Sequence, residues 1–172
     1  ITGNSGFKVG SNTVSVKVTA GNGTTKTYTI TVTRRQDTVA TLSSLSLTGC
    51  TLSPTFASGT TEYTCAVENS VASTTVSATT TSSVATVTGT GNKSLKVGSN
   101  EVNVKVTAQD ESTSKTYKVV VTRKASSDAT LKSLSVTGYT ISPTFASGTT
   151  SYTLSVPYSV TSITVNAEVN NS

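Results

Sequence analysis

The side chains that most often carry out chemistry are scarce in this chain of 172 residues. Histidine is missing, and with it the usual general base at neutral pH, histidine-based triads and most metal sites. Asp110 and Glu111 are the only adjacent carboxylates among eight acidic residues. They lie in a predicted hairpin tip whose counterpart in an earlier repeat has no acid, so we interpret them as a solvated turn. The sequence therefore predicts no catalytic residues and no cofactor.

Two cysteines, Cys50 and Cys65, are the remaining reactive groups. Two thiolates without histidine or a second cysteine pair cannot complete a zinc site, and the CxxC spacing of redox centres is absent. Their role therefore depends on the elements that position them.

An internal repeat organises those elements. The segment SPTFASGTT occurs at residues 53–61 and again at 142–150, a shift of 89 residues, and the flanking segments repeat at nearly the same spacing. Such a period indicates a tandem array of small modules. We expect residues 1–37 to be the C-terminal part of one repeat, 38–125 a complete repeat and 126–172 the N-terminal part of another. We also expect the chain to be a segment of a longer array.

Strict alternation of apolar and polar residues predicts strands within each repeat. Val102, Val104 and Val106 fall on one face of a strand, and the first copy repeats the pattern at Val14 and Val16. Clusters of Gly, Ser, Asn and Thr, such as VGSN at 97–100 and ASGTT at 57–61, predict turns. In the complete repeat we expect about seven strands, at residues 42–47, 61–67, 74–80, 85–89, 94–97, 101–108 and 115–123.

Seven short strands with no helical period are typical of an immunoglobulin-like sandwich, here without a Cys…Trp…Cys core. The segments ATLSSLSLTG, LSPTFASGTTEYT and VGSNEVNVKVTAQDESTSKTYKVVVTR resemble the cadherin-like β-sandwich repeat of bacterial surface and secreted proteins. The resemblance covers almost the entire chain. It implies an all-β fold of tandem modules with about seven antiparallel strands each, in an extracellular protein, and it implies no particular activity.

The cysteines acquire a role within this fold. Their counterparts in the next copy, 89 residues on, are Tyr139 and Leu154, so both positions change together. Paired replacement suggests that the two positions are in contact, and the sandwich then predicts a Cys50–Cys65 disulfide. The alternative is two buried thiols that pack without a bond. A disulfide implies an oxidising compartment, which agrees with a secreted or cell-surface location.

Ligand sites are weakly indicated. Calcium needs six to eight oxygen ligands, but the two module junctions hold one aspartate each, beside basic residues. The tyrosines Tyr139 and Tyr158 could stack on sugar rings, although Tyr139 is better explained as packing in place of a cysteine. Basic residues recur at matching positions, which favours either attraction to an anionic polymer or solubility and protection of strand edges. The matched pairs are Lys8/Lys96, Lys17/Lys105, Lys26/Lys115 and Arg34/Arg123.

These patterns favour a structural segment of a bacterial extracellular protein, a stalk or filament without catalysis. The alternative is an adhesive module that binds carbohydrate or cell wall. We expect neighbouring copies of the repeat as partners, arranged head to tail in cis or in trans, with polysaccharide as a further candidate. Nucleic acid is not expected, because no aromatics interleave with the basic residues. Membrane insertion is not expected either, because no apolar run is long enough.

Overall fold

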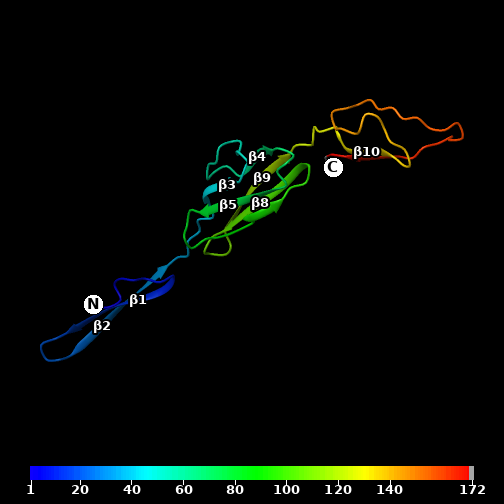
Figure 1. The fold of residues 1–172 in the computed structure, drawn as a ribbon. Helices are drawn as coiled ribbons and strands as arrows, with labels where there is room; N and C mark the ends of the chain where they lie inside the picture. Colours follow the sequence, from blue (N-terminus) through cyan, green and yellow to red (C-terminus); the bar gives the residue numbers. More distant parts are fainter. Residues whose placement is uncertain (171–172) are drawn as a thin grey trace. The chain divides into compact units, whose positions relative to one another are not determined.

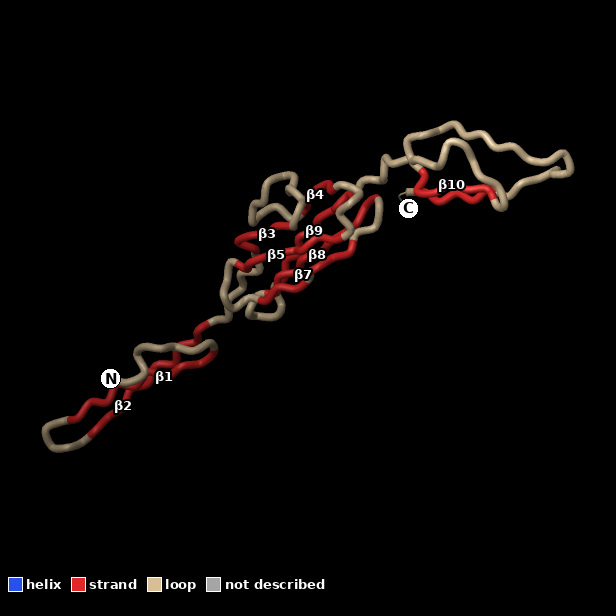
Figure 2. Tube along the Cα trace, viewed as in Figure 1, coloured by secondary structure: helices blue, strands red, loops and turns tan. Residues whose placement is uncertain are grey.

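The computed structural model describes residues 1–170 and shows two compact units, Ile1–Arg123 and a second unit that begins at Lys124 (Figure 1). The described residues form strands and loops and no helix (Figure 2). Accordingly, no helix in this part of the chain could span a membrane. The all-β prediction is confirmed, whereas the division into three parts of a repeat stays a prediction.

Residues 38–125, the predicted complete repeat, fold as a sandwich of two sheets, here called the central module. One sheet has the order β3-β5-β7, and the other has the order β4-β9-β8-β6. The strands are β3 (Leu42–Leu47), β4 (Glu62–Val67), β5 (Ser73–Thr80), β6 (Thr86–Thr88), β7 (Gly91–Ser94), β8 (Gly98–Thr107) and β9 (Ser114–Arg123).

One strand pair departs from the predicted antiparallel arrangement. β4 runs parallel to β9, with Glu62 opposite Lys118 and Val67 opposite Arg123, while the other pairs in these two sheets are antiparallel. Antiparallel neighbours can be joined by a tight hairpin, but β4 is reached from β3, which belongs to the other sheet, through the long loop 48–61. The chain thus crosses between the sheets before β4 begins.

The core lies between the sheets and is built from the alternating positions that the sequence marks as inward. On β8 and β9, Val104, Val106, Tyr117 and Val119 are completely buried. Thr74 is the buried polar side chain of this core, and its hydroxyl donates a hydrogen bond to the Thr48 carbonyl at 2.8 Å. Burying a polar group is tolerated when it is hydrogen-bonded in this way.

Two predicted boundaries are wrong. β7 ends at Ser94, three residues before the predicted end of that strand, and β8 begins at Gly98 inside the predicted VGSN turn. The Asn100 side chain explains the second difference. It accepts a hydrogen bond from the Lys96 amide and donates one to the Lys96 carbonyl, both at 2.8 Å. The side chain closes the turn, which leaves the backbone of 98–100 free to pair with β9.

The first part of the chain forms a hairpin of β1 (Gly10–Thr19) and β2 (Thr25–Arg34), paired as a sheet of two strands. In the second unit, β10 (Leu131–Val136) pairs with β11 (Val165–Val169). Residues 151–156, the counterpart of β4, form no strand there beyond a single bridge between Thr153 and Ser142.

Candidate functional site

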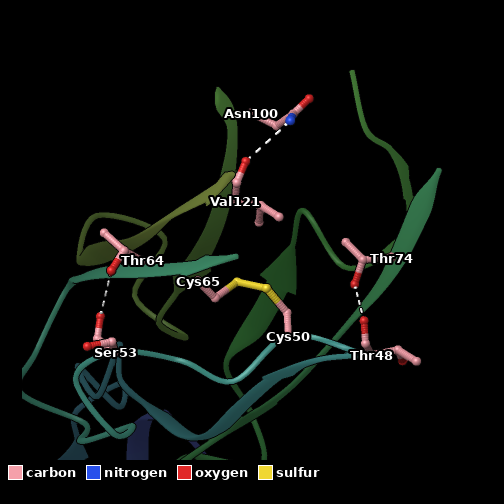
Figure 3. The surroundings of a disulfide bond; sticks show 8 residues. All are labelled: Thr48, Cys50, Ser53, Thr64, Cys65, Thr74, Asn100 and Val121. Atoms are coloured by element: carbon pink, nitrogen blue, oxygen red, sulfur yellow. Dashed lines mark hydrogen bonds between the residues drawn. A yellow bond between two sulfur atoms is a disulfide. The ribbon is translucent and has the colours of Figure 1, made fainter. Parts of the chain in front are cut away.

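A disulfide between Cys50 and Cys65 joins the two sheets of the central module (Figure 3). Cys50 follows β3, where it forms a one-pair bridge with Leu47, and Cys65 lies on β4 of the other sheet. The Cα atoms are 5.7 Å apart, a distance typical of disulfides. The predicted pairing is confirmed, and the alternative of two unbonded thiols is wrong.

The surroundings of the disulfide give it a structural role. Ser53 and Thr64 exchange two backbone hydrogen bonds of 2.8 Å each, which closes the same loop a few residues inside the disulfide. The Thr64 hydroxyl also donates to the Ser53 carbonyl at 3.4 Å (Figure 3). Cys65 is buried, so water and other thiols have little access to its sulfur. In the chain-entropy model, a bond across 15 residues of sequence stabilises the fold by about 3 kcal/mol.

The closed loop wraps around two buried tyrosines. The Tyr117 hydroxyl accepts a hydrogen bond from the Leu42 amide at 3.0 Å and donates one to the Ser58 carbonyl at 2.8 Å. The Tyr63 hydroxyl donates to the Ala57 carbonyl at 2.8 Å. The loop thus satisfies its backbone groups through side chains, because it has no strand partner for most of its length.

Sequence reasoning missed these tyrosine contacts. The signal was present in the repeated KTY segment at 26–28 and 115–117, because the same aromatic residue follows the same lysine in both copies. In the structure, the Lys115 ammonium lies 5.8 Å from the centre of the Tyr117 ring, and Lys26 lies 5.4 Å from that of Tyr28. These are cation–π distances.

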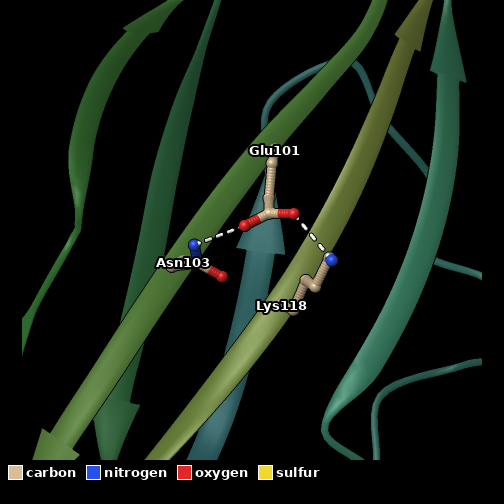
Figure 4. Close-up of polar contacts among 3 residues, drawn as sticks. All are labelled: Glu101, Asn103 and Lys118. Carbon is tan, nitrogen blue, oxygen red and sulfur yellow. Dashed lines mark hydrogen bonds and ion pairs between the residues drawn. The ribbon is translucent and has the colours of Figure 1, made fainter.

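A polar trio on the outer face of β8 and β9 consists of Glu101, Asn103 and Lys118 (Figure 4). The Glu101 carboxylate lies 2.6 Å from the Lys118 ammonium and accepts a hydrogen bond from the Asn103 amide at 2.8 Å. The hydrogen bond with Lys118 lowers the pKa of Glu101, and the same bond raises the pKa of Lys118. Both groups are therefore held in their charged forms, which suits neither a general base nor a nucleophilic amine.

A surface pocket of about 500 Å³ lies beside this trio and includes Glu62 and Lys118 in its lining. Its remaining lining consists of Ser53, Pro54, Tyr63, Thr64 and Val120. Charged Lys118 and the carboxylate of Glu62 are its ionisable side chains apart from the buried Tyr63 phenol. The pocket holds no paired carboxylates and no activated nucleophile, so the geometry supports no reaction there.

The Asp110 carboxylate accepts hydrogen bonds within its own turn, in agreement with the predicted turn. It accepts hydrogen bonds from the Thr113 hydroxyl at 2.6 Å, from the Thr113 amide at 2.9 Å and from the Ser112 hydroxyl at 2.8 Å. The bond from the Thr113 hydroxyl is the main reason why the pKa of Asp110 is lowered. Among residues 1–170, no three His, Cys, Asp or Glu side chains gather in a group that could hold a metal ion.

The matched arginines, Arg34 and Arg123, donate hydrogen bonds to backbone carbonyls of neighbouring segments. Arg123 donates to the carbonyls of Asn69 and Leu95 at 2.8 and 2.9 Å, and Arg34 donates to the Phe7 carbonyl at 2.7 Å. Because Phe7 is the counterpart of Leu95, part of this contact is repeated in the first copy. Both arginines thus hold adjacent segments of their own fold together.

The family model for a cadherin-like beta sandwich domain matches three segments of the chain, residues 4–35, 42–124 and 131–172. The chain belongs to this family. The sandwich of the central module agrees with that assignment. A search of curated proteins finds no match. As a cadherin-like β-sandwich chain, the protein is a structural or adhesive module.

Proposed function

We propose that this cadherin-like chain is a structural tandem-repeat segment of a bacterial extracellular protein, which forms a stalk or filament and catalyses no reaction. The resemblance to repeats of bacterial surface proteins and the disulfide support an extracellular location. The functional groups support the structural role, because the disulfide, the tyrosine hydroxyls and the carboxylates described above all stabilise their own module.

The observation that carries the proposal is the junction before the central module. The Asp37 carboxylate accepts a hydrogen bond from the Ser82 hydroxyl at 2.6 Å and from the Val39 amide at 2.8 Å. The Asp37 amide donates to the Gln109 side chain at 3.0 Å, and its carbonyl accepts from the Asp110 amide at 3.3 Å. Backbone and side chain of one linker residue are thus fixed to two loops of the module.

This attachment leaves only residues 35 and 36 between β2 and the first anchored residue. So short a connection restricts rotation between modules, whereas a flexible linker needs many residues. A stalk or filament requires such restriction, because freely jointed modules would collapse rather than extend.

Electron microscopy of the native material tests the proposal. We expect straight rods or fibres with a regular spacing along the axis. The variant Asp37→Ala removes the carboxylate that holds the junction, so its particles should show a wider range of bend angles. Asp128→Ala, at the other junction, is the matched control. Particles with a wide range of bend angles in the wild type would refute a stalk or filament.

One observation favours the second candidate, an adhesive module for polysaccharide. The Tyr158 side chain is fully exposed in a turn of the second unit. Exposed aromatic rings can stack on sugars. A saturable NMR shift of the Tyr158 ring on addition of cell-wall oligosaccharides, lost in Tyr158→Ala, would support this function over a purely structural one.

A further inference from the structure

The tip of the hairpin β1–β2 contains Asn22 followed by Gly23, the only asparagine–glycine pair in the chain. Both residues are exposed. The side chain of an asparagine loses its amide group when the backbone nitrogen of the next residue attacks the side-chain carbonyl carbon. Glycine hinders this attack least, because it has no Cβ beside the nitrogen. The pair is therefore a candidate site of covalent modification.

The turn holds the Asn22 side chain against its own backbone. The Asn22 Oδ1 accepts a hydrogen bond from the Thr24 amide at 3.1 Å, in the arrangement called an Asx turn. The Gly23 nitrogen lies between the two bonded groups along the chain, so the contact keeps the Asn22 Cγ close to it. The hydrogen bond also draws electron density from the side-chain carbonyl, which makes Cγ easier to attack.

The attacking nitrogen is restrained by one backbone contact. The Gly23 amide donates a hydrogen bond to the Ala20 carbonyl at 2.9 Å, which closes the turn. Because a donated hydrogen bond makes the nitrogen less ready to lose its proton, the reaction requires this contact to open. The tip is exposed and lies at the end of a ribbon of two strands, where local opening costs little free energy.

The corresponding turn of the central module carries an acid at this position. The Glu111 amide donates to the Ala108 carbonyl as the Gly23 amide donates to the Ala20 carbonyl. Gly23 and Glu111 also share a positive φ, of 85° and 57° respectively. The residues before them, Asn22 and Asp110, are therefore counterparts. Asp110 shows what the same turn looks like with a carboxylate in place of the amide.

The Asp110 carboxylate makes contacts that the Asn22 amide cannot make. Its Oδ1 accepts from the Ser112 amide at 3.2 Å, which matches the contact between Asn22 and Thr24. Its Oδ2 also accepts from the hydroxyls of Ser112 and Thr113. In Asn22 an NH₂ group takes the place of that oxygen, and it donates hydrogen bonds but accepts none. Asp110 remains partly exposed although its own amide binds a linker carbonyl, so this position of the turn stays open to water.

We propose that Asn22 is a site of spontaneous deamidation, and that its aspartate product caps the hairpin tip as Asp110 caps the turn of the central module. The inference goes beyond the proposed function and does not depend on it. The Gly23 nitrogen forms a bond to the Asn22 Cγ, and the side-chain NH₂ leaves with the Gly23 amide proton as ammonia. Water then opens the cyclic succinimide, at the side-chain carbonyl to give aspartate or at the backbone carbonyl to give isoaspartate. Water is the sole co-reactant, and the loss of ammonia makes the change irreversible.

Asn12, in β1 of the same hairpin, provides an internal control. Its side chain accepts a hydrogen bond from the Lys8 amide at 2.9 Å and donates one to the Lys8 carbonyl at 2.7 Å. The next residue is Thr13, whose branched side chain crowds its own nitrogen. Both features slow the attack on the Asn12 Cγ. Asn100 makes the same pair of contacts with Lys96 in the central module and is a second control.

Peptide mapping by mass spectrometry, after incubation of the whole chain in heavy-oxygen water at mildly alkaline pH, tests the reaction. We expect the peptide that contains Asn22 to gain the mass of the amide-to-acid change together with heavy oxygen. Asn22 should react at least about tenfold faster than Asn12, which corresponds to a difference of about 1.4 kcal/mol in activation free energy. Gly23→Ala, whose Cβ would meet no atom within 4 Å, should suppress the reaction. Equal rates at Asn22 and Asn12, or an unchanged rate in Gly23→Ala, would overturn the proposal.

The variant Asn22→Asp tests the role of the product. Its second carboxylate oxygen should accept from the Thr24 hydroxyl, as the Asp110 carboxylate accepts from Thr113. Hydrogen exchange of the Thr24 amide should then slow about fivefold, the factor expected for one more hydrogen bond of about 1 kcal/mol. Adding Thr24→Val, which removes the hydroxyl, should abolish this gain. Unchanged or faster exchange in Asn22→Asp would show that the carboxylate does not cap the tip.

Discussion

The disulfide gives the sharpest stability prediction. Replacing both cysteines, Cys50→Ala with Cys65→Ala, opens a loop whose ends are 15 residues apart in sequence. The chain-entropy model then predicts a loss of about 3 kcal/mol from the free energy of unfolding of the central module. Hydrogen exchange followed by mass spectrometry isolates this module, because β9 exchanges only when its sandwich opens. Exchange in β9 should accelerate roughly 100-fold, since about 1.4 kcal/mol corresponds to a factor of ten.

A second variant separates the bond from its packing. Cys50→Tyr with Cys65→Leu introduces the pair that the next copy carries at Tyr139 and Leu154. If the bond acts by restricting the unfolded chain, this variant should exchange nearly as fast as the alanine variant. Full protection in the Tyr–Leu variant would show that packing alone stabilises the site. Unchanged exchange in both variants would refute the loop-closure reasoning.

Three other changes probe the central module. Tyr117→Phe leaves the buried Leu42 amide without its hydroxyl partner, and urea denaturation should show a loss of about 1–3 kcal/mol. Gly89→Ala places a Cβ 2.0 Å from the Asn103 carbonyl oxygen at a φ of +88°, so exchange in β6 should rise while β3 is less affected. The hydrogen bond from Ser82 lowers the pKa of Asp37 from its usual 3.8. The ionised Asp37 carboxylate therefore stabilises the folded state fully above pH 3.8, and this contribution is lost as the pH falls through the lower pKa of the folded state. Asp37→Asn should flatten the dependence of the free energy of unfolding on pH in this range.

Much of the central module could be predicted from local pattern. The predicted strand 42–47 coincides with β3, and the inward positions of β8 and β9 are the buried ones. The disulfide could be predicted as well. Cys50 and Cys65 are both replaced in the next copy, and this paired change indicates a contact between two positions that no local pattern would show. Comparison between copies thus supplied long-range information that a single repeat lacks.

Other features depend on contacts that the residue pattern does not reveal. The VGSN segment has the composition of a turn, but the Asn100 side chain makes the turn and frees the backbone for β8. The parallel direction of β4 follows from its place beside β9, which belongs to a different part of the repeat. Neither the capping role of one side chain nor the order of strands in a sheet follows from alternation of apolar residues.

The clearest example is the pair of segments 62–67 and 151–156. Apolar and polar residues alternate in the same way in both segments, EYTCAV and SYTLSV. In both, a threonine exchanges backbone hydrogen bonds with a preceding serine, Thr64 with Ser53 and Thr153 with Ser142. Only the first is a strand, because only the first lies beside a β9. Intrinsic preference for the extended state is therefore insufficient here, since a strand needs a neighbour to bond with.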